Sequence, residues 1–245
     1  MRYKLTLQYD GGRYHGWQKQ PHEPMTVQAA VEEAASRVTG VRTAVTASGR
    51  TDEGVHALGQ VAHFDSDKAL PTDRYVAALN HWLPCDIRVT DCTVVPDTFD
   101  ARKSAKRKTY AYRMYTGETE NPLRRTRETF IGRADVRKMK DAASLFVGVH
   151  DLKAFMSSGS SAKTTIREIY ASDVTEEGTS VVFRVTGNGF LYNTVRIMAG
   201  ALIRLGKGGD AVIAEALKSG DRRLVPDIAP PEGLYLERVE YPETV

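Results

Sequence analysis

The segment Arg2-Tyr3-Lys4-Leu5-Thr6-Leu7-Gln8-Tyr9 alternates between polar and apolar side chains over its whole length. The odd positions would face a core and the even positions would face solvent, which is the period of a half-buried β-strand. Asp10-Gly11-Gly12 follows and is typical of a turn. The chain is therefore expected to open with one strand of an antiparallel sheet that is buried on one face.

Further elements follow this strand in a regular order. We expect strands near 42–47, 59–64 and 87–95, and helices that open at Thr26 and Pro71 and stop at Gly40 and Pro84. The resulting order is β-α-β-β-α-β. This split arrangement folds as an antiparallel sheet with helices on one face.

The second half of the chain repeats this order with longer insertions. We expect strands near 108–116, 166–174, 180–186 and 234–241, and helices that follow Asp135 and cover about 192–205 and 211–217. The sequence thus predicts an α+β fold of two duplicated β-α-β-β-α-β units, similar to RNA-recognition-motif or ferredoxin-like folds. We place the units at residues 1–103 and 104–245, and expect their mainly antiparallel sheets to join with a cleft between them.

The charge of the chain is concentrated in one region. The whole chain carries 34 Lys/Arg and 31 Asp/Glu, yet residues 102–140 alone hold 13 Lys/Arg and only 4 Asp/Glu. A concentrated positive block is the footprint of a surface that binds a polyanion, although a solvated face without a partner would look the same.

Other function classes find little support. Residues 200–208 resemble a P-loop but have the wrong spacing, and residues 187–192 lack the third glycine of a dinucleotide fingerprint. Cys85 and Cys92 have no metal-ligand spacing. We therefore expect no nucleotide cofactor and no metal. No apolar run suggests a signal peptide or a membrane span, so a cytoplasmic location is expected.

The loop Gly49–Ala57 contains the strongest candidate for a catalytic side chain, the carboxylate of Asp52. Asp52 stands between Arg50 and Glu53, and glycines on both sides permit a tight turn. A carboxylate beside an arginine stays ionised and suits nucleophilic or general-base work. Residue types alone, however, favour a polar turn with an incidental Arg–Asp pair.

Several motifs extend this observation along nearly the whole chain. They are Tyr9-Asp10-Gly11, Tyr14-His15-Gly16-Trp17-Gln18, Ser48-Gly49-Arg50-Thr51-Asp52-Glu53-Gly54-Val55-His56-Ala57, Phe99-Asp100-Ala101-Arg102, Lys108-Thr109-Tyr110, Gly189-Phe190-Leu191-Tyr192-Asn193-Thr194-Val195-Arg196 and Ala229-Pro230-Pro231-Glu232-Gly233-Leu234. In this order they resemble the tRNA pseudouridine synthase A family. Thr194 departs from the pattern, which has methionine there, at a position of packing rather than of chemistry.

The resemblance implies a cofactor-free isomerase that converts uridine to pseudouridine in the anticodon stem-loop of tRNA, at about positions 38, 39 and 40. It implies that Asp52 is the essential aspartate, that Arg196 pairs with it across the cleft and that Tyr110 stacks on the target base. Arg50 would help to hold the RNA. The family also implies a homodimer.

Weaker expectations concern the RNA-facing surface. The basic residues Lys106, Arg107 and Lys108 lie beside Tyr110 in sequence, and RNA helices are recognised largely through phosphates and shape. His15 and Trp17 lie in the N-terminal loop, where RNA contact is also possible. Two alternatives remain open: a non-catalytic RNA-binding module, and a small-glycoside hydrolase that would need a second carboxylate, for which Glu53 is the nearest candidate.

Overall fold

The chain is divided into two units by its internal contacts. The computed structural model describes residues 1–159, 162–210 and 212–242. The first unit comprises Met1–Lys106 together with Leu236–Val245, and the second comprises Arg107–Tyr235. The sequence assigned all of 104–245 to the second unit, whereas the structure groups the chain from Leu236 onward with the first.

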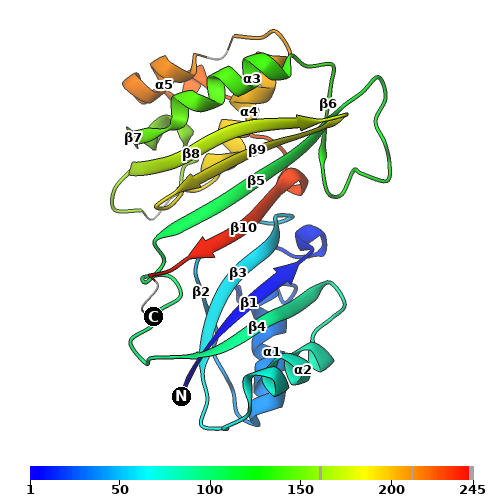
Figure 1. Ribbon diagram of the computed structural model, residues 1–245, viewed down its shortest axis with the longest axis vertical. Coiled ribbons are helices and arrows are strands. Elements are labelled where there is room, and N and C mark those ends of the chain that lie inside the picture. The colour runs from blue at the N-terminus through cyan, green and yellow to red at the C-terminus, as the bar shows by residue number, and fades with distance from the viewer. Residues whose placement is uncertain (160–161, 211, 243–245) are drawn as a thin grey trace. The chain divides into compact units, whose positions relative to one another are not determined.

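The first unit is a sheet covered by two helices. Its elements are β1 (Arg2–Tyr9), η1 (Gly11–Arg13), α1 (Val27–Thr39), β2 (Thr46–Ala47), β3 (His56–Asp65), α2 (Thr72–Trp82) and β4 (Ile87–Val95). The strand order is β4-β1-β3-β10, with β2 beside β3. β10 (Leu234–Glu240) belongs to this unit from Leu236 onward. β1 pairs with β3 and β4 in antiparallel fashion, and α1 and α2 lie together behind the sheet in Figure 1.

The alternation in β1 determines which side of this sheet is covered. Tyr3, Leu5 and Leu7 have no exposed surface, while the residues between them are only half-buried. Tyr3 lies 4.4 Å from Tyr75 of α2 and 5.4 Å from Phe64 of β3 between ring centroids. This aromatic cluster joins helix to sheet, and its burial is a main source of stability for the unit.

The caps of α1 follow the sequence signals. The hydroxyl of Thr26 accepts from the N–H of Ala29, and Gly40 ends the helix with φ of +84°. The strand expected over 42–47 shrinks to Thr46–Ala47, because side chains of α1 take its backbone N–H groups. Ser36 Oγ accepts from Thr43 N at 3.0 Å, and Glu32 Oε1 accepts from Val45 N at 3.2 Å.

The second unit has a sheet order of β5-β9-β8-β7, and β6 lies parallel beside β5. Its elements are β5 (Arg107–Thr116), β6 (Thr129–Gly132), α3 (Val136–Ala143), η2 (Ser144–Phe146), β7 (Gly148–Asp151), η3 (Leu152–Phe155), β8 (Ile166–Glu177), β9 (Ser180–Gly187), α4 (Thr194–Gly206), α5 (Ile213–Ser219), η4 (Arg222–Leu224) and η5 (Pro231–Gly233). Its last two residues, Leu234 and Tyr235, begin β10. One face of β9, formed by Val181, Phe183 and Val185, is fully buried.

The α+β class and the mainly antiparallel pairing are confirmed. The second unit is not a simple repeat of the first, since β6 and β7 are short strands that the periodicity did not predict. The duplication therefore stays a prediction. The expected helix start at Ala211 lies outside the described residues, and the helix itself is observed from Ile213.

Gly59 provides a test of the sheet in the first unit. A Cβ at this position of β3 would lie 2.6 Å from the carbonyl oxygen of Glu237, whereas a Cβ at Gly117 would meet nothing closer than 3.5 Å. We expect Gly59→Ala to lower the free energy of unfolding by about 1–3 kcal/mol, because backbone cannot move aside as a side chain can. Gly117→Ala is the control. Urea denaturation followed by circular dichroism measures both, and equal midpoints would contradict this packing.

Candidate active site

The loop that carries Asp52 connects β2 to β3, as the sequence predicted. Thr51 and Val55 are buried, Asp52 is half-buried, and Arg50 and Glu53 are exposed. The loop is therefore fastened on both sides of Asp52, while Asp52 itself keeps part of its surface exposed. Gly54 has φ of +76°, a left-handed conformation that glycine adopts without strain.

The chain after β1 packs against this loop backbone to backbone. The N–H of Trp17 donates to the carbonyl of Thr51 at 2.9 Å, and the N–H of Val55 donates to the carbonyl of Asp52 at 3.1 Å. A Cβ at Gly16 would stand 2.8 Å from the Thr51 carbonyl oxygen, and one at Gly11 would collide with the carbonyl of Val55. Only glycine permits such an approach. Gly11 and Gly16 therefore determine how closely the segment after β1 packs against the Asp52 loop.

A buried polar network supports the loop from below. Gln60, which has no exposed surface, donates to the carbonyl of Gly49 at 3.0 Å and accepts from Ser48 Oγ at 2.7 Å. The hydroxyls of Tyr9 and Thr51 lie 2.8 Å apart. Burial raises the pKa of Tyr9 to about 12, so its hydroxyl remains a neutral partner at physiological pH.

The two buried histidines act as backbone acceptors. His56 Nδ1 accepts from the N–H of Gly11 at 3.0 Å and lies 3.1 Å from Asp10 Oδ1. His63 Nδ1 accepts from the N–H of Ala101 at 3.1 Å, and burial lowers its pKa, which favours the neutral ring. Both rings therefore hold neighbouring segments in place.

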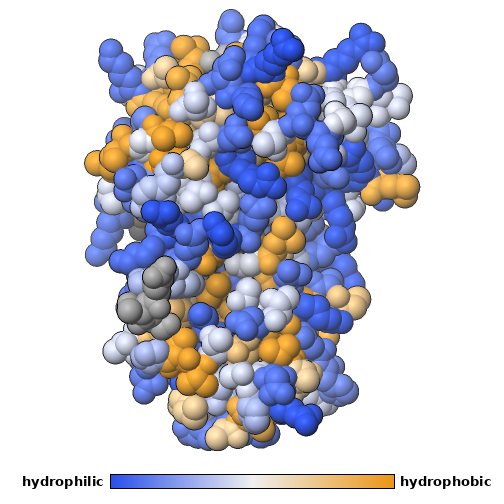
Figure 2. All heavy atoms as spheres, viewed as in Figure 1, coloured by the Kyte–Doolittle hydropathy of each residue, from blue (hydrophilic) through white to orange (hydrophobic). Residues whose placement is uncertain are grey.

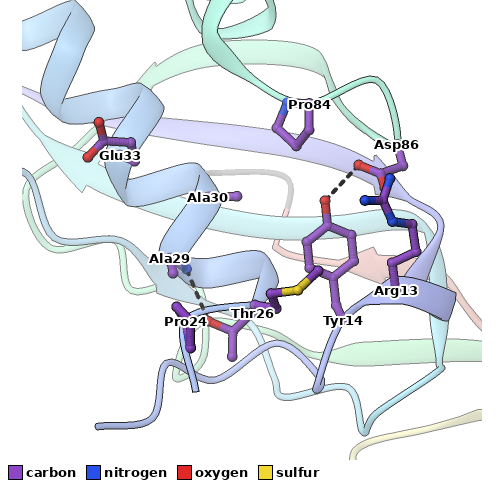
Figure 3. Close-up of a pocket in the computed structure, with 10 residues that line it drawn as sticks. Arg13, Tyr14, Pro24, Thr26, Ala29, Ala30, Glu33, Pro84 and Asp86 are labelled. Atoms are coloured by element: carbon purple, nitrogen blue, oxygen red, sulfur yellow. Dashed lines mark hydrogen bonds and ion pairs between the residues drawn. The ribbon is translucent and has the colours of Figure 1, made fainter. Parts of the chain in front are cut away.

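The N-terminal loop is itself anchored on its outer side. A pocket of about 390 Å³ lies there, and Figure 3 shows Tyr14 pointing across it toward Asp86. The Tyr14 hydroxyl donates to Asp86 Oδ1 at 2.6 Å, and Arg13 lies 3.7 Å from the other carboxylate oxygen. These contacts tie the loop to the α2–β4 connection, so the segment that presses on the Asp52 loop has its own support.

The remaining candidates of the first unit lie in these same two loops. Arg50 is exposed and donates through Nε to Gln18 Oε1 at 3.1 Å. His15 is 43% exposed and lies 3.3 Å from Glu53 and 3.5 Å from Glu23. Trp17, expected at an RNA-facing position, is only 2% exposed and packs against Tyr9 at a centroid distance of 6.0 Å. Its ring fills the core beneath the loop, and this burial argues against the RNA contact expected for Trp17.

In the second unit, Arg196 is fixed near the start of α4. Its Nε donates to the carbonyl of Ala229 at 2.7 Å, and its guanidinium also donates to Asn193 Oδ1 at 3.0 Å. Asn193 has φ of +62°, the only positive φ of a non-glycine residue among 1–159, 162–210 and 212–242. A strained residue held by its surroundings is a frequent mark of a functional site. Arg196 is half-buried.

Thr194, the residue that departs from the family pattern, forms a hydrogen bond at the start of α4. Its hydroxyl is buried and accepts from the N–H of Leu191 at 3.1 Å. This bond satisfies a donor that precedes the first turn of α4, which a methionine side chain would not do. The substitution therefore bears on how the helix begins.

Tyr110 and the basic residues before it lie at the start of β5. Tyr110 is 9% exposed and meets Phe190 edge to face, with centroids 5.3 Å apart. Arg107 lies over the ring of Tyr170 at 4.7 Å, and the side chains of Lys106 and Arg107 are exposed, whereas Lys108 is half-buried. The sequence did not single out Gly11, Gly16 or Gln60 as parts of the site. The presence of Gly11 and Gly16 in the first two family-like motifs was the only signal for them.

Two features bear on function class. Among the described residues, no group of three or more His, Cys, Asp or Glu side chains could hold a metal ion. No helix in the described part of the chain is long and apolar enough to cross a membrane.

Comparisons with known proteins agree on one family. A family model described as tRNA pseudouridine synthase matches residues 6–102 and 142–242. The protein named tRNA pseudouridine synthase A 2 of Bacillus anthracis is 42% identical over 242 residues, which cover 98% of this chain and 99% of that one. The protein named tRNA pseudouridine synthase A of Geobacter sp. (strain M21) is 45% identical over 244 residues, 98% of each chain.

A solved structure is more distant. The chain described as "Crystal Structure of a Cbf5-Nop10-Gar1 Complex" is 16% identical, covers 83% of this chain and 45% of its own, and has a TM-score of 0.35. This similarity is too low to support an argument. The family model and the full-length relatives suffice: the chain belongs to the tRNA pseudouridine synthase family.

Proposed function

We propose that this chain converts uridine to pseudouridine in the anticodon stem-loop of tRNA, at about positions 38, 39 and 40, with Asp52 as the catalytic carboxylate. Membership of the family makes the chain an isomerase that acts on tRNA. The observation that carries the finer proposal is the half-buried Asp52 on a loop whose backbone is fixed on both sides. A catalytic group must be held in its productive geometry by its surroundings, and this loop meets that requirement.

The reaction needs a carboxylate and little else. The bond between ribose C1′ and uracil N1 breaks, the base turns, and C1′ bonds to C5, while C5 loses a proton and N1 gains one. No electrons are gained or lost overall. Positive character develops at C1′ as the first bond breaks, and a carboxylate placed there can trap or stabilise it. Asp52 can serve in either way, by bonding to C1′ or by promoting departure of the base.

Glu53 is a poor candidate for a second catalytic carboxylate. Its side chain is 70% exposed and lies against His15. A hydrolase of small glycosides would need two carboxylates that flank one bond. Adjacent residues with such different exposure do not provide that arrangement, so the structure favours a single carboxylate mechanism.

Three further side chains complete the proposed site. We assign to Arg196 the role of charge partner for Asp52, to Tyr110 the stacking of the flipped base, and to Arg50 a hold on the RNA. A guanidinium beside the aspartate would keep it ionised at neutral pH. An aromatic face would replace the stacking that the base loses when it leaves the helix. The family resemblance supports these roles, as do the fixed Arg196 side chain and the exposed Arg50.

The partners and location follow from the same resemblance. We propose that the protein acts as a homodimer in the cytoplasm and that its tRNA contacts the basic residues before Tyr110. Support for the RNA surface comes from the exposed side chains of Lys106 and Arg107. A non-catalytic RNA-binding module would not need a carboxylate fixed by two glycines.

Asp52→Asn tests the central role. We expect it to abolish pseudouridine formation on a tRNA transcript while tRNA affinity stays within a few-fold, because only the charge is removed. Glu53→Gln removes the neighbouring carboxylate and should retain activity. Mass spectrometry of digested tRNA measures the product. Retained activity in Asp52→Asn would show that Asp52 is not the catalytic carboxylate. Loss of tRNA binding would indicate that Asp52 serves RNA binding instead.

Gly11→Ala tests whether the position of the Asp52 loop matters for catalysis. The new methyl group would collide with the carbonyl of Val55, so the Asp52 loop must shift. We expect turnover to fall about 100-fold, the effect of a displacement near 1 Å at a catalytic group. Gly12→Ala is the matched control, because its nearest neighbour is the movable Asp10 carboxylate at 3.2 Å. Single-turnover kinetics should separate the two, and equal rates would show that the backbone packing does not position Asp52.

Neutral glutamines at Lys106, Arg107 and Lys108 test the RNA surface. We expect lower tRNA affinity and a shallower dependence of that affinity on salt, because each lost phosphate contact reduces the slope by about 0.7–0.9. The same change at the exposed residues Lys207, Lys218 and Arg223 serves as control. Filter binding at several salt concentrations measures the slopes. A slope equal to that of the unmodified protein would show that the RNA-binding surface lies elsewhere on the protein.

A further inference from the structure

We propose that the loop between β5 and β6 is a rigid probe for a double-stranded stem of the tRNA, with Leu123 contacting the groove and Arg125 contacting a phosphate. The inference rests on the proposed function. The loop covers residues 117–128 and so lies outside both stretches that the family model matches. Figure 1 shows it projecting away from the strands of the second unit.

Arg124 fastens the loop from inside. Its guanidinium lies over the ring of Tyr115 at 4.1 Å and forms an ion pair with Glu128. It also donates to Thr179 Oγ1 at 3.1 Å and to Ser180 Oγ at 2.9 Å. One side chain thus connects the loop to β5 and to the turn before β9. An arginine that is only 20% exposed and has this many partners holds its loop firmly.

Backbone contacts fix the rest of the loop. The N–H of Asn121 donates to the Tyr115 hydroxyl at 2.9 Å, and Asn121 Oδ1 accepts from the N–H of Leu123 at 2.9 Å. At the far end, the hydroxyl of Tyr235 donates to the carbonyl of Arg127 at 2.9 Å. The loop is therefore preorganised, and a ligand that meets it bears little ordering cost.

This rigid loop presents an apolar side chain to solvent. Leu123 is 90% exposed, the most exposed large hydrophobic side chain of the described residues. Arg125 is exposed as well, and Figure 2 shows mainly hydrophilic side chains around this loop. A scaffold that orders a leucine without burying it gains nothing for its own core. The arrangement suits a leucine that is buried against something else.

The placement of charge in the loop points to the partner. Residues 117–128 carry three arginines and three glutamates, of which Glu128 is paired with Arg124 and Glu118 with Arg133. Arg125 is exposed and lies two residues from the exposed Leu123, so a cation stands beside the apolar side chain. Phosphate contacts position a protein on a nucleic acid, and apolar side chains such as leucine insert at the groove. The minor groove of an RNA helix is wide and shallow and is within reach of a short side chain. A stem of tRNA therefore fits the loop better than an uncharged protein surface.

Three variants test the proposal by their affinity for a tRNA transcript. We expect Leu123→Ala to weaken binding about tenfold, the factor for loss of a buried leucine contact. Leu123→Lys separates the apolar contact from charge: it should also weaken binding, whereas a purely electrostatic loop would bind more tightly. Arg125→Ala should weaken binding and flatten its salt dependence. Val149→Ala, at a 66% exposed valine of β7, is the control and should bind as the unmodified protein does.

Two further readouts make the result decisive. Binding to single-stranded oligouridylate should be unchanged in Leu123→Ala, since it offers no groove. Unchanged tRNA affinity in Leu123→Ala, or tighter binding in Leu123→Lys, would overturn the proposal. A change in oligomeric mass without a change in tRNA affinity would also overturn it and show that Leu123 docks a second copy. Pseudouridine formation by the unmodified protein is measured on the same transcript, so failure of the proposed function would be seen separately.

Discussion

The close approach of two backbone segments is the constraint on which the candidate site depends. Gly11 and Gly16 allow the chain after β1 to lie directly against residues 51–55, and hydrogen bonds between main-chain atoms fix the distance. Gln60 supports the loop from the core side, and Tyr14 and Asp86 brace the outer side. Asp52 is therefore presented by a fixed scaffold, as the catalytic role proposed for it requires.

The second unit prepares its own residues by the same means. Asn193 adopts a left-handed conformation and, together with the carbonyl of Ala229, holds the guanidinium of Arg196 in one orientation. Phe190 holds the ring of Tyr110 edge to face. In both units, supporting residues that take no proposed part in the reaction fix the position of the candidate site residues. Such supporting contacts commonly decide whether a site is functional.

Much of this could be predicted from the sequence, and the misses have physical causes. The alternation in Arg2–Tyr9 and the caps Thr26 and Asp135 predicted their elements well, because these signals are local. The strand near 42–47 was overestimated, since side chains of α1 bind its backbone. Trp17 was expected at the surface because a loop position does not reveal which rings reach the core. The glycine packing joins Gly11 to Val55 and Gly16 to Thr51, which are distant in the sequence, so no local pattern shows it.

The central claim is that this scaffold serves to isomerise uridine within tRNA. Its most direct test is a nucleotide-resolved map of pseudouridine in a single tRNA transcript, made before and after incubation with the unmodified protein and no added cofactor. The account predicts new pseudouridine confined to the anticodon arm, at about positions 38, 39 and 40. A transcript that gains no pseudouridine, or gains it only in another arm, would contradict the account.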